Sequence, residues 1–301
     1  LSSGNENRSV SDWFSKMLVL MRKRLKNYIL LMGFACDNPR KHNRVISLIL
    51  NMSDQSKPTI IVPARLASVR FPKKLLAEIH GKPLILHTAD RLRSEVPEFD
   101  LFFAVDGDEI ALPLQKGGYE TILTNPNLAS GTDRVAEANE VLNRDTIINV
   151  QADEPTVSRS HVLALAEALE DPATSMSTLA VPFHLENEFS DPNQVKVVLG
   201  NDGSALYFSR SAIPYDRDAQ TEWRSATEMK RPLKHLGMYG YKKVFLETFA
   251  QSEPGQLERL EKLEQLRALE MGFRIAVRIV EEPTLGIDQP HDLEAFKSLL
   301  I

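Results

Sequence analysis

Two things are scarce in this 301-residue sequence: it has a single cysteine, Cys36, and it lacks any run of about eighteen uncharged apolar residues. One cysteine excludes an intrachain disulfide and a cysteine-based metal site, and it is typical of a reducing compartment. Basic residues at positions 22 to 24 and 26 interrupt the most hydrophobic N-terminal stretch, so we expect no membrane span. We therefore predict a cytoplasmic protein.

Positive charge is scarce in most of the chain. The net charge is -5, but residues 1–51 hold nine Lys/Arg against three Asp/Glu, which leaves -11 for the remainder. An acidic body argues against a broad nucleic-acid surface, because such a surface needs a basic face. The charge pattern instead favours a small ligand that a local cluster of cations holds.

The first 56 residues differ from the rest and are predicted to be an N-terminal extension outside the main fold. A basic segment precedes the apolar stretch Tyr28–Cys36, as in a signal peptide, but this stretch is short and nothing downstream looks exported. We prefer a native start at Met52, with an upstream extension before it. Residues 57–301 are then one domain.

From Thr59 onward, short apolar runs alternate with helical patterns, which is typical of βαβ units around a mostly parallel sheet. Three runs bounded by polar residues are predicted strands: Thr59–Val62, Leu101–Val105 and Thr146–Val150. Two segments that follow helix-start signals are predicted helices: Leu84–Leu92 and Arg134–Leu142. The pattern indicates an α/β fold with helices on the faces of the sheet.

The middle of the chain has a different pattern. Asn201-Asp202-Gly203 lies between the apolar runs Gln194–Leu199 and Ala205–Ser209, which predicts an antiparallel hairpin. We expect residues 182–240 to form a smaller subdomain, after which a leucine-rich helix runs over Leu257–Met271.

The loop after the first predicted strand is strongly basic. Residues 63–74 contain Arg65, Arg70, Lys73 and Lys74 and no acid. Ligands bind at the carboxyl ends of strands in open α/β sheets, so this loop is placed to hold a polyphosphate. It matches neither a glycine-rich dinucleotide loop nor a Walker loop. A basic loop is often only a solvated surface, and its position is what favours a site.

A second polar segment, Gln151–Pro155, directly follows the strand that ends at Val150. Magnesium prefers one or two carboxylates together with phosphate oxygens and water. Asp153, facing a basic phosphate loop, therefore fits a magnesium ligand. The alternative is an acid that only supports a turn.

These segments, with others in the same order, resemble the 3-deoxy-manno-octulosonate cytidylyltransferase (CMP-Kdo synthetase) family over about Lys57 to Ile301. The segments that carry the resemblance are Pro63-Ala64-Arg65, Ser68, Arg70-Phe71-Pro72, Gly81-Lys82-Pro83, Ser130-Gly131-Thr132, Asn149-Val150-Gln151, Asp153-Glu154-Pro155, Leu206 to Arg210, Ile213-Pro214, His235-Leu236-Gly237, Tyr239, Leu263 to Arg267 and Asp288.

The resemblance implies a nucleotide-diphospho-sugar transferase fold. This is a Rossmann-like, mixed and mostly parallel sheet flanked by helices, with a smaller antiparallel β subdomain that pairs two subunits in a homodimer. It also implies a Mg²⁺-dependent enzyme that joins CMP from CTP to Kdo, an acidic eight-carbon sugar, and releases pyrophosphate, for lipopolysaccharide synthesis. The sugar's anomeric hydroxyl is expected to attack the α-phosphorus in line, without a covalent enzyme intermediate.

The same resemblance assigns roles to individual residues. Those implied for CTP are Ala64, Arg65, Ser68, Arg70, Lys74, Ser130, Gly131 and Thr132. Those implied for the sugar are Gln151, His235, Tyr239, Glu264, Gln265 and Arg267. Those implied for catalysis are Arg65, Lys74, Asp153 and Asp288, of which the two aspartates are the metal ligands.

Several of these residues also have a purely structural interpretation. Asp288 could merely support a turn, Arg267 could pair with neighbouring glutamates, and His235 could be a core histidine. Glu258 and Glu261 are expected on a solvated helix face or at a dimer contact.

The chain departs from the family pattern at several positions. The family's Gly-Lys-Pro reads Lys73-Lys74-Leu75, where the register selects Lys74 as the phosphate contact, and Ala152 replaces a glycine. Asn127-Leu128-Ala129 stands where many members have a histidine, and Asp133 replaces a common glutamate, which leaves the nucleobase contacts open.

Three alternatives remain at this stage. The nearest is the same chemistry on 8-amino-3,8-dideoxy-manno-octulosonate. More distant ones are CMP-sialic acid synthesis and a non-catalytic nucleotide-binding protein, which would be expected to have lost Asp153 or the basic loop.

Overall fold

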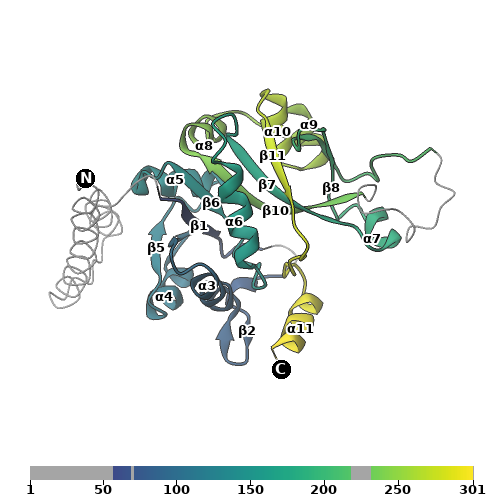
Figure 1. The fold of residues 1–301 in the computed structure, drawn as a ribbon. Helices are drawn as coiled ribbons and strands as arrows, with labels where there is room; N and C mark the ends of the chain where they lie inside the picture. The colour runs from purple at the N-terminus through teal and green to yellow at the C-terminus, as the bar shows by residue number, and fades with distance from the viewer. Residues whose placement is uncertain (1–56, 69–70, 218–231, 301) are drawn as a thin grey trace, which may run out of the picture. The chain divides into compact units, whose positions relative to one another are not determined.

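A nine-stranded mixed β-sheet runs through the part of the chain that the computed structural model describes, residues 57–68, 71–217 and 232–300 (Figure 1). The predictions for the extension 1–56 and for Arg70 lie outside these residues, as does the segment 218–231 of the predicted subdomain.

The strands of this sheet are β1 (Thr59–Ala64), β4 (Asp100–Val105), β5 (Glu120–Leu123), β6 (Thr146–Asn149), β7 (Met176–Pro182), β8 (Lys196–Leu199), β9 (Ala205–Ser209), β10 (Leu233–Lys242) and β11 (Ile275–Ile279). Their order is β11-β7-β10-β6-β1-β4-β5, with β8 paired to both β10 and β9. A separate two-stranded sheet joins β2 (Glu78–Ile79) and β3 (Lys82–Pro83).

One half of the sheet is parallel. Strand β1 lies between β4 and β6 and is parallel to both, and β5 extends this half beyond β4. All six residues of β1 are buried, as expected for an apolar strand covered on both faces. The three predicted strands are confirmed as β1, β4 and β6, and their carboxyl ends lie at one edge of the sheet.

The other half is largely antiparallel and depends on β10. This strand runs antiparallel to β6 on one side and to β7 on the other, with a register shift between Leu236 and Tyr239. The predicted hairpin is confirmed: β8 and β9 pair antiparallel, and Gly203 has a φ of 75° in the connecting turn. The predicted mixed, mostly parallel sheet with a smaller antiparallel part is thus found in the structure.

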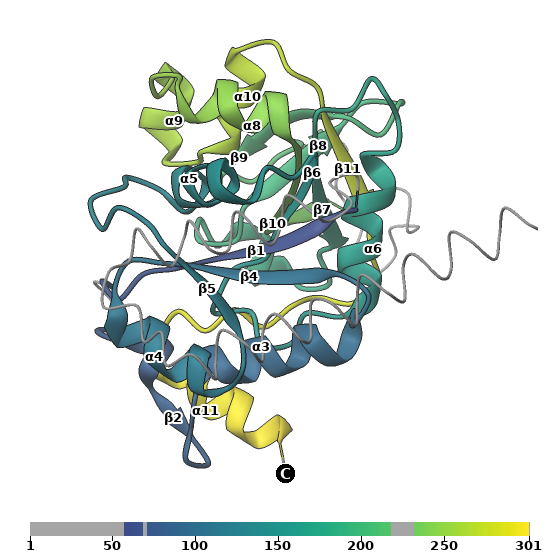
Figure 2. The same ribbon diagram turned by 90° about the vertical axis from the view of Figure 1, so that its left-hand side faces the viewer.

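The helices are α3 (Leu84–Glu95), α4 (Asp108–Lys116), α5 (Gly131–Leu142), α6 (Arg159–Ala168), α7 (Glu186–Ser190), α8 (Lys243–Ala250), α9 (Gln256–Glu261), α10 (Gln265–Glu270) and α11 (Pro290–Leu299), with a 3₁₀ turn η1 (Lys74–Leu76). Figure 2 shows α5, α8, α9 and α10 on one face of the sheet and α3, α4 and α11 on the other. The helices predicted at Leu84–Leu92 and Arg134–Leu142 are confirmed as α3 and α5.

The single helix predicted over Leu257–Met271 is wrong. The chain forms two short helices there, α9 and α10, because Lys262 adopts a left-handed conformation with a φ of 54°. This turn buries Leu263, whereas Leu260 stays 71% exposed. The leucines of this segment therefore do not all pack in the core. Burial of Leu263 and Leu266 offsets the modest cost of a left-handed lysine.

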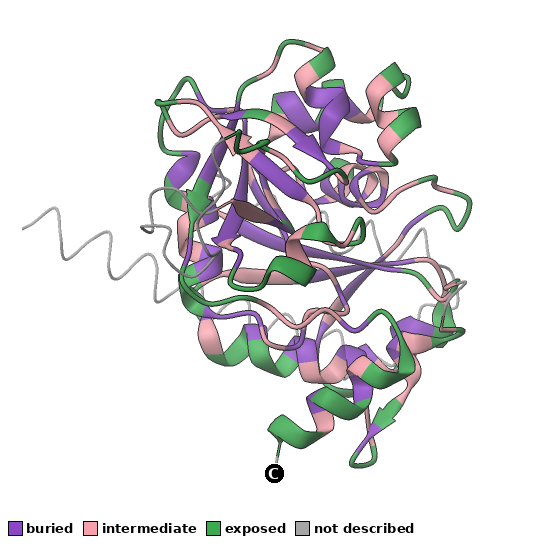
Figure 3. Ribbon diagram, turned by 90° about the vertical axis from the view of Figure 1, so that its right-hand side faces the viewer, coloured by how far each residue is buried: buried purple, intermediate pink, exposed green. Residues whose placement is uncertain are grey.

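The core lies mainly between the parallel strands and the helices on the α3 side. Apolar side chains from α3, α4, α6 and α11 pack there against β1, β4 and β6. Figure 3 shows the buried residues concentrated in the strands and the exposed residues on the outer helix faces. Within residues 57–68, 71–217 and 232–300, each helix is too short or too polar to span a membrane.

Candidate active site

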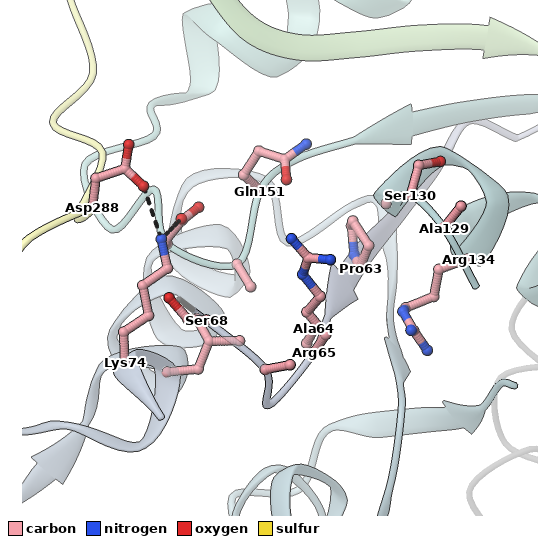
Figure 4. Close-up of a pocket in the computed structure, with 15 residues that line it drawn as sticks. Pro63, Ala64, Arg65, Ser68, Lys74, Ala129, Ser130, Arg134, Gln151 and Asp288 are labelled. Atoms are coloured by element: carbon pink, nitrogen blue, oxygen red, sulfur yellow. Dashed lines mark hydrogen bonds and ion pairs between the residues drawn. The ribbon is translucent and has the colours of Figure 1, made fainter. Parts of the chain in front are cut away.

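A pocket of about 500 Å³ lies where the carboxyl ends of β1 and β6 meet the start of α5 (Figure 4). The residues that line it are Pro63, Ala64, Arg65, Ala67, Ser68, Lys74, Leu75, Ala129, Ser130, Gly131, Arg134, Gln151, Ala152, Asp153 and Asp288. Segments more than 200 residues apart in the chain therefore contribute to one site. In the view of Figure 4, Lys74 and Asp288 lie at one end and Ser130 and Arg134 at the other, with Arg65 and Gln151 between them.

The basic loop after β1 contributes two cations to this pocket, Arg65 and Lys74. Its backbone is held in place by Asp106, which follows β4 and accepts a hydrogen bond of 2.8 Å from the Leu66 amide. Lys73 is directed elsewhere, since its Nζ lies 2.5 Å from Glu109 Oε1. Of the two adjacent lysines, the structure thus places Lys74 in the pocket.

Lys74 contacts both aspartates predicted to bind the metal, Asp153 and Asp288. Its ammonium forms an ion pair with Asp153, lies 3.1 Å from Asp288 Oδ1, and donates to the Ile287 carbonyl at 2.9 Å. Burial opposes the charge on Lys74, but the two carboxylates outweigh it and raise the pKa of this side chain. The Lys74 side chain is 13% exposed and that of Asp153 is 23% exposed, so water screens this pair less than the pair with Asp288, whose side chain is 52% exposed.

The two carboxylates fit a divalent metal ion that also binds a nucleotide. Asp153 and Asp288 both reach the same ammonium and both line the pocket. Among the described residues, no cluster of three or more His, Cys, Asp or Glu could hold a metal by itself. Magnesium needs no such cluster when a triphosphate supplies oxygen ligands, so this pair suits Mg²⁺ better than a metal with a full protein cage.

Backbone contacts hold the two aspartate-bearing segments against each other. The Ile287 amide donates to the Asp153 carbonyl at 2.9 Å, and the Leu285 amide donates to Thr156 Oγ1 at 2.7 Å. Next to Asp153, burial raises the pKa of Glu154 to about 7, and a Cβ added at Gly286 would lie 3.1 Å from its Oε1. Glu154 therefore packs between the two segments. The sequence analysis assigned it no such role, because its burial depends on the distant segment around Gly286.

The start of α5 forms the opposite end of the pocket. Ser130 caps this helix through a reciprocal capping box with Asp133, as the predicted helix-start signal required. The Ser130 and Thr132 hydroxyls donate to Glu264 at 2.9 and 3.0 Å. Glu264, which the resemblance assigns to the sugar, thus contacts two residues that it assigns to CTP, Ser130 and Thr132. Burial raises the pKa of its carboxyl.

Arg134 is a pocket residue that the sequence analysis missed. It lies one turn into α5, is 2% exposed, and donates from Nη1 to Thr124 Oγ1. Burial lowers the pKa of its guanidinium, although Asp106 and Glu137 partly oppose this. The signal available in the sequence was its place at the start of the predicted helix Arg134–Leu142, directly after Ser130 to Asp133.

Of the residues implied for the sugar, Gln151 lines the pocket, and its Nε2 donates to the Gly237 carbonyl at 3.4 Å. His235 and Gln265, which are buried, form a chain with the partly buried Tyr239, on β10 and α10. Tyr239 donates to Gln265 Oε1 at 3.2 Å, and Gln265 Nε2 lies 3.5 Å from His235 Nδ1. His235 Nε2 lies 2.9 Å from Thr178 Oγ1, and burial lowers the pKa of this histidine to about 3.

Arg267 is not among the residues that line the pocket. Its guanidinium binds both carboxylate oxygens of Glu258 at 2.7 Å and lies over the ring of Phe249. These contacts match the alternative interpretation given for Arg267, in which it pairs with a neighbouring glutamate. The solvated face expected for Glu258 and Glu261 is wrong, because the Glu258 side chain is 13% exposed and Glu261 accepts from Ser209 Oγ at 2.7 Å. The alternative of a dimer contact stays a prediction.

Known cytidylyltransferases resemble this chain in sequence. The family model for cytidylyltransferases matches residues 59–278. The chain is 45% identical over 244 residues to the 3-deoxy-manno-octulosonate cytidylyltransferase of Syntrophobacter fumaroxidans (strain DSM 10017 / MPOB), covering 80% of this chain and 95% of that protein.

Solved structures extend the likeness to three dimensions. CMP:2-keto-3-deoxy-manno-octonic acid synthetase complexed with CTP matches with a TM-score of 0.74 and 36% identity, over 81% of this chain and 98% of its own. 4-Diphosphocytidyl-2C-methyl-D-erythritol synthase from Anaerococcus prevotii DSM 20548 matches with a TM-score of 0.54 and 14% identity, over 82% and 99%. At that identity the second match shows a shared fold only.

Proposed function

Because the chain belongs to the 3-deoxy-manno-octulosonate cytidylyltransferase family, we propose that its pocket binds CTP and Kdo and joins them as CMP-Kdo. The protein is a nucleotidyltransferase, and CTP-dependent activation of Kdo is its reaction. The assignment to this pocket rests on one observation: Arg65, Lys74 and Asp153 all line it. Cations for a triphosphate and a carboxylate for its metal face one space.

The reaction is a displacement at the α-phosphorus of CTP. The anomeric oxygen of Kdo forms a bond to this phosphorus. The bond between the α-phosphorus and the oxygen that bridges it to the β-phosphorus breaks, and pyrophosphate leaves with that oxygen. The proton of the attacking hydroxyl passes to water. Catalysis of this kind depends on positioning and on neutralising charge, with little covalent chemistry for the protein.

The loop after β1 supplies the neutralising groups. Arg65 and Lys74 bind triphosphate oxygens through charge-assisted hydrogen bonds, and Ser68 adds a hydroxyl to the same cradle. Lys74 exchanges part of its contact with Asp153 for a phosphate oxygen when the nucleotide enters. The Asp106 contact to the Leu66 amide keeps this loop in position before the substrate arrives.

Asp153 and Asp288 are the residues proposed to hold Mg²⁺. When bound, the ion offsets charge on the triphosphate and lowers the pKa of the attacking hydroxyl. The Asp153→Asn variant should lose at least about 100-fold in pyrophosphate release and should bind Mn²⁺ more weakly in a paramagnetic titration. Near-normal pyrophosphate release by Asp153→Asn would overturn the metal assignment.

Gln151 and the neighbouring β10 segment are proposed to receive the sugar. Gln151 lies between the aspartates and Gly237, and a Cβ added at Gly237 would meet no atom within 4 Å. This open space next to the phosphate end suits a sugar that must approach the α-phosphorus.

The acceptor can be tested directly. Purified protein would be offered CTP with Kdo, its 8-amino analogue or sialic acid, with pyrophosphate release and product mass as readouts. We expect CMP-Kdo as the preferred product. A higher kcat/KM for either other sugar would reassign the acceptor and leave the chemistry intact, whereas no release with any of them would overturn the function.

We also propose a cytoplasmic homodimer that pairs through the smaller antiparallel part. Leu206 on β9 and Tyr215 just beyond it are 61% and 86% exposed, which supports an interface at this surface. Light scattering should give twice the monomer mass, and Leu206→Asp should shift it toward one chain.

A further inference from the structure

A buried arginine at the end of the pocket away from the metal-binding aspartates has no part in the reaction described above. Arg134 is 2% exposed and lines the pocket beside Ser130 and Gly131. A desolvated guanidinium is costly unless its donors meet acceptors. Its contacts therefore indicate what the site is built to bind.

Within the described residues, these contacts leave much of the donor capacity of Arg134 unused. Its guanidinium donates from Nη1 to one partner, Thr124 Oγ1, and forms no ion pair with a described carboxylate. Thr124 itself is anchored, because its hydroxyl donates to the Val105 carbonyl at 2.9 Å. Arg134 is thus fixed at one nitrogen, while its other N–H groups remain for a ligand in the pocket.

The position of Arg134 fits the base of a nucleotide. The charged end, with Lys74, Asp153 and Asp288, accounts for the triphosphate, so the nucleoside must extend toward α5 (Figure 4). That end is lined by Ala129, Ser130, Gly131 and Arg134. A Cβ added at Gly131 would lie 3.4 Å from Pro63 Cγ, so strand β1 and the helix start approach each other closely. Of the parts of CTP, the nucleoside remains for this end of the pocket.

We propose that Arg134 reads the nucleobase, with two parallel N–H groups donating to N3 and O2 of cytosine. This inference rests on the proposed use of CTP and deepens it. Cytosine presents acceptors at both N3 and O2, which match the planar fork of a guanidinium. Uracil carries a hydrogen on N3, so two donors would face each other there. Arg134 is therefore the specificity-determining residue for CTP over UTP.

The test compares the ratio of kcat/KM for CTP to kcat/KM for UTP in wild type and in Arg134→Gln. The glutamine amide offers one donor and one acceptor, so it can face either base. We expect the ratio to fall by about 10-fold to 100-fold, the usual loss for one bidentate base contact. The ratio of the affinities for CMP and UMP, measured by calorimetry without Kdo, should fall in the same direction.

Arg144→Gln is the matched control. Arg144 is also fully buried, but it pairs with Asp100 at 2.9 Å and does not line the pocket. This variant should lose thermal stability while its CTP-to-UTP ratio stays that of wild type. A ratio that falls equally in Arg144→Gln would show a general effect of destabilisation and overturn the proposal.

A second variant covers poor folding of Arg134→Gln. Thr124→Val removes the anchor of the guanidinium and leaves the pocket lining intact, so it should lower the same ratio by a few-fold. An unchanged ratio in every folded variant would make Arg134 a purely structural residue. If the wild-type protein binds CMP in preference to UMP but forms no CMP-Kdo, the proposed reaction is overturned, while the role of Arg134 in recognising cytosine is retained.

Discussion

Lys74 and Asp153 form a direct ion pair across the pocket, although 79 residues separate them in the chain. The same ammonium lies 3.1 Å from Asp288, so one cation already lies between the two carboxylates proposed to bind Mg²⁺. A divalent ion must therefore share or replace the contacts of Lys74. We expect nucleotide binding to assist this exchange, because the triphosphate would offer the ammonium new partners.

Replacing Lys74 should separate the roles of the two adjacent lysines. Lys74→Met should lower kcat/KM for CTP by about 100-fold, since it removes charge-assisted bonds to the triphosphate. Lys73→Met should change it less than about 3-fold, because Lys73 pairs with Glu109 outside the pocket. Steady-state kinetics on folded protein would decide this. Equal losses in the two variants would contradict the placement of the lysines.

Without nucleotide, Lys74→Met should bind Mn²⁺ more tightly than wild type, because no ammonium then competes for Asp153 and Asp288. Paramagnetic titration of the free protein measures this directly. Unchanged or weaker binding would mean that the ammonium does not compete with the ion.

Arg267 should contribute mainly to stability. Its side chain is 7% exposed and that of its partner Glu258 is 13% exposed, so Arg267→Met leaves a buried carboxylate without its cation. The free energy of unfolding should fall by about 3 kcal/mol or more in urea. Glu258→Gln in the same chain should recover part of this loss. A variant of normal stability with a raised KM for Kdo would instead place Arg267 at the sugar.

His235 should make the fold sensitive to acid. Burial lowers the pKa of this histidine from 6.5 to about 3, so the unfolded chain takes up its proton at a higher pH than the folded chain does. Its contribution to stability is complete above about pH 6.5 and is lost as the pH falls toward 3. Between pH 7.5 and 5 the loss is about 2 kcal/mol.

His235→Gln provides the comparison for this pH effect. In wild type, His235 Nε2 lies 2.9 Å from Thr178 Oγ1. A glutamine amide at position 235 can still reach this hydroxyl, but it does not titrate. The difference in unfolding free energy between wild type and this variant should shrink by about 2 kcal/mol from pH 7.5 to 5. A constant difference would show that the imidazole charges in the folded protein as it does in water.

Two glycines of β10 should respond differently to alanine. A Cβ at Gly240 would lie 2.9 Å from Leu169 Cδ1 and 3.2 Å from the Leu165 carbonyl oxygen, and it would collide with Ser177 Oγ. Gly240→Ala should therefore lower the unfolding free energy by about 2 to 3 kcal/mol. Gly237→Ala meets open space and should stay within about 0.5 kcal/mol of wild type. Similar losses in both would contradict the close packing at Gly240.

Local sequence determined the parallel half of the sheet and the position of the site. The strand Thr59–Ala64 is a continuous apolar run, and a basic loop follows it, so burial of the strand places Arg65 and Lys74 at its carboxyl end. The capping box at Ser130 likewise requires only neighbouring residues. Each of these features depends on an apolar run or on contacts within a few residues, which a sequence displays directly.

Only the tertiary structure decided which distant side chains meet. Strand β10 has two glycines and no clear alternation, and it is held in the sheet by antiparallel pairing with β6 on one side and β7 on the other. The turn at Lys262 depends on burying Leu263, and the position of Arg134 in the pocket depends on how α5 packs against β1. These outcomes follow from strand order and from the desolvation of single side chains, which no local pattern encodes.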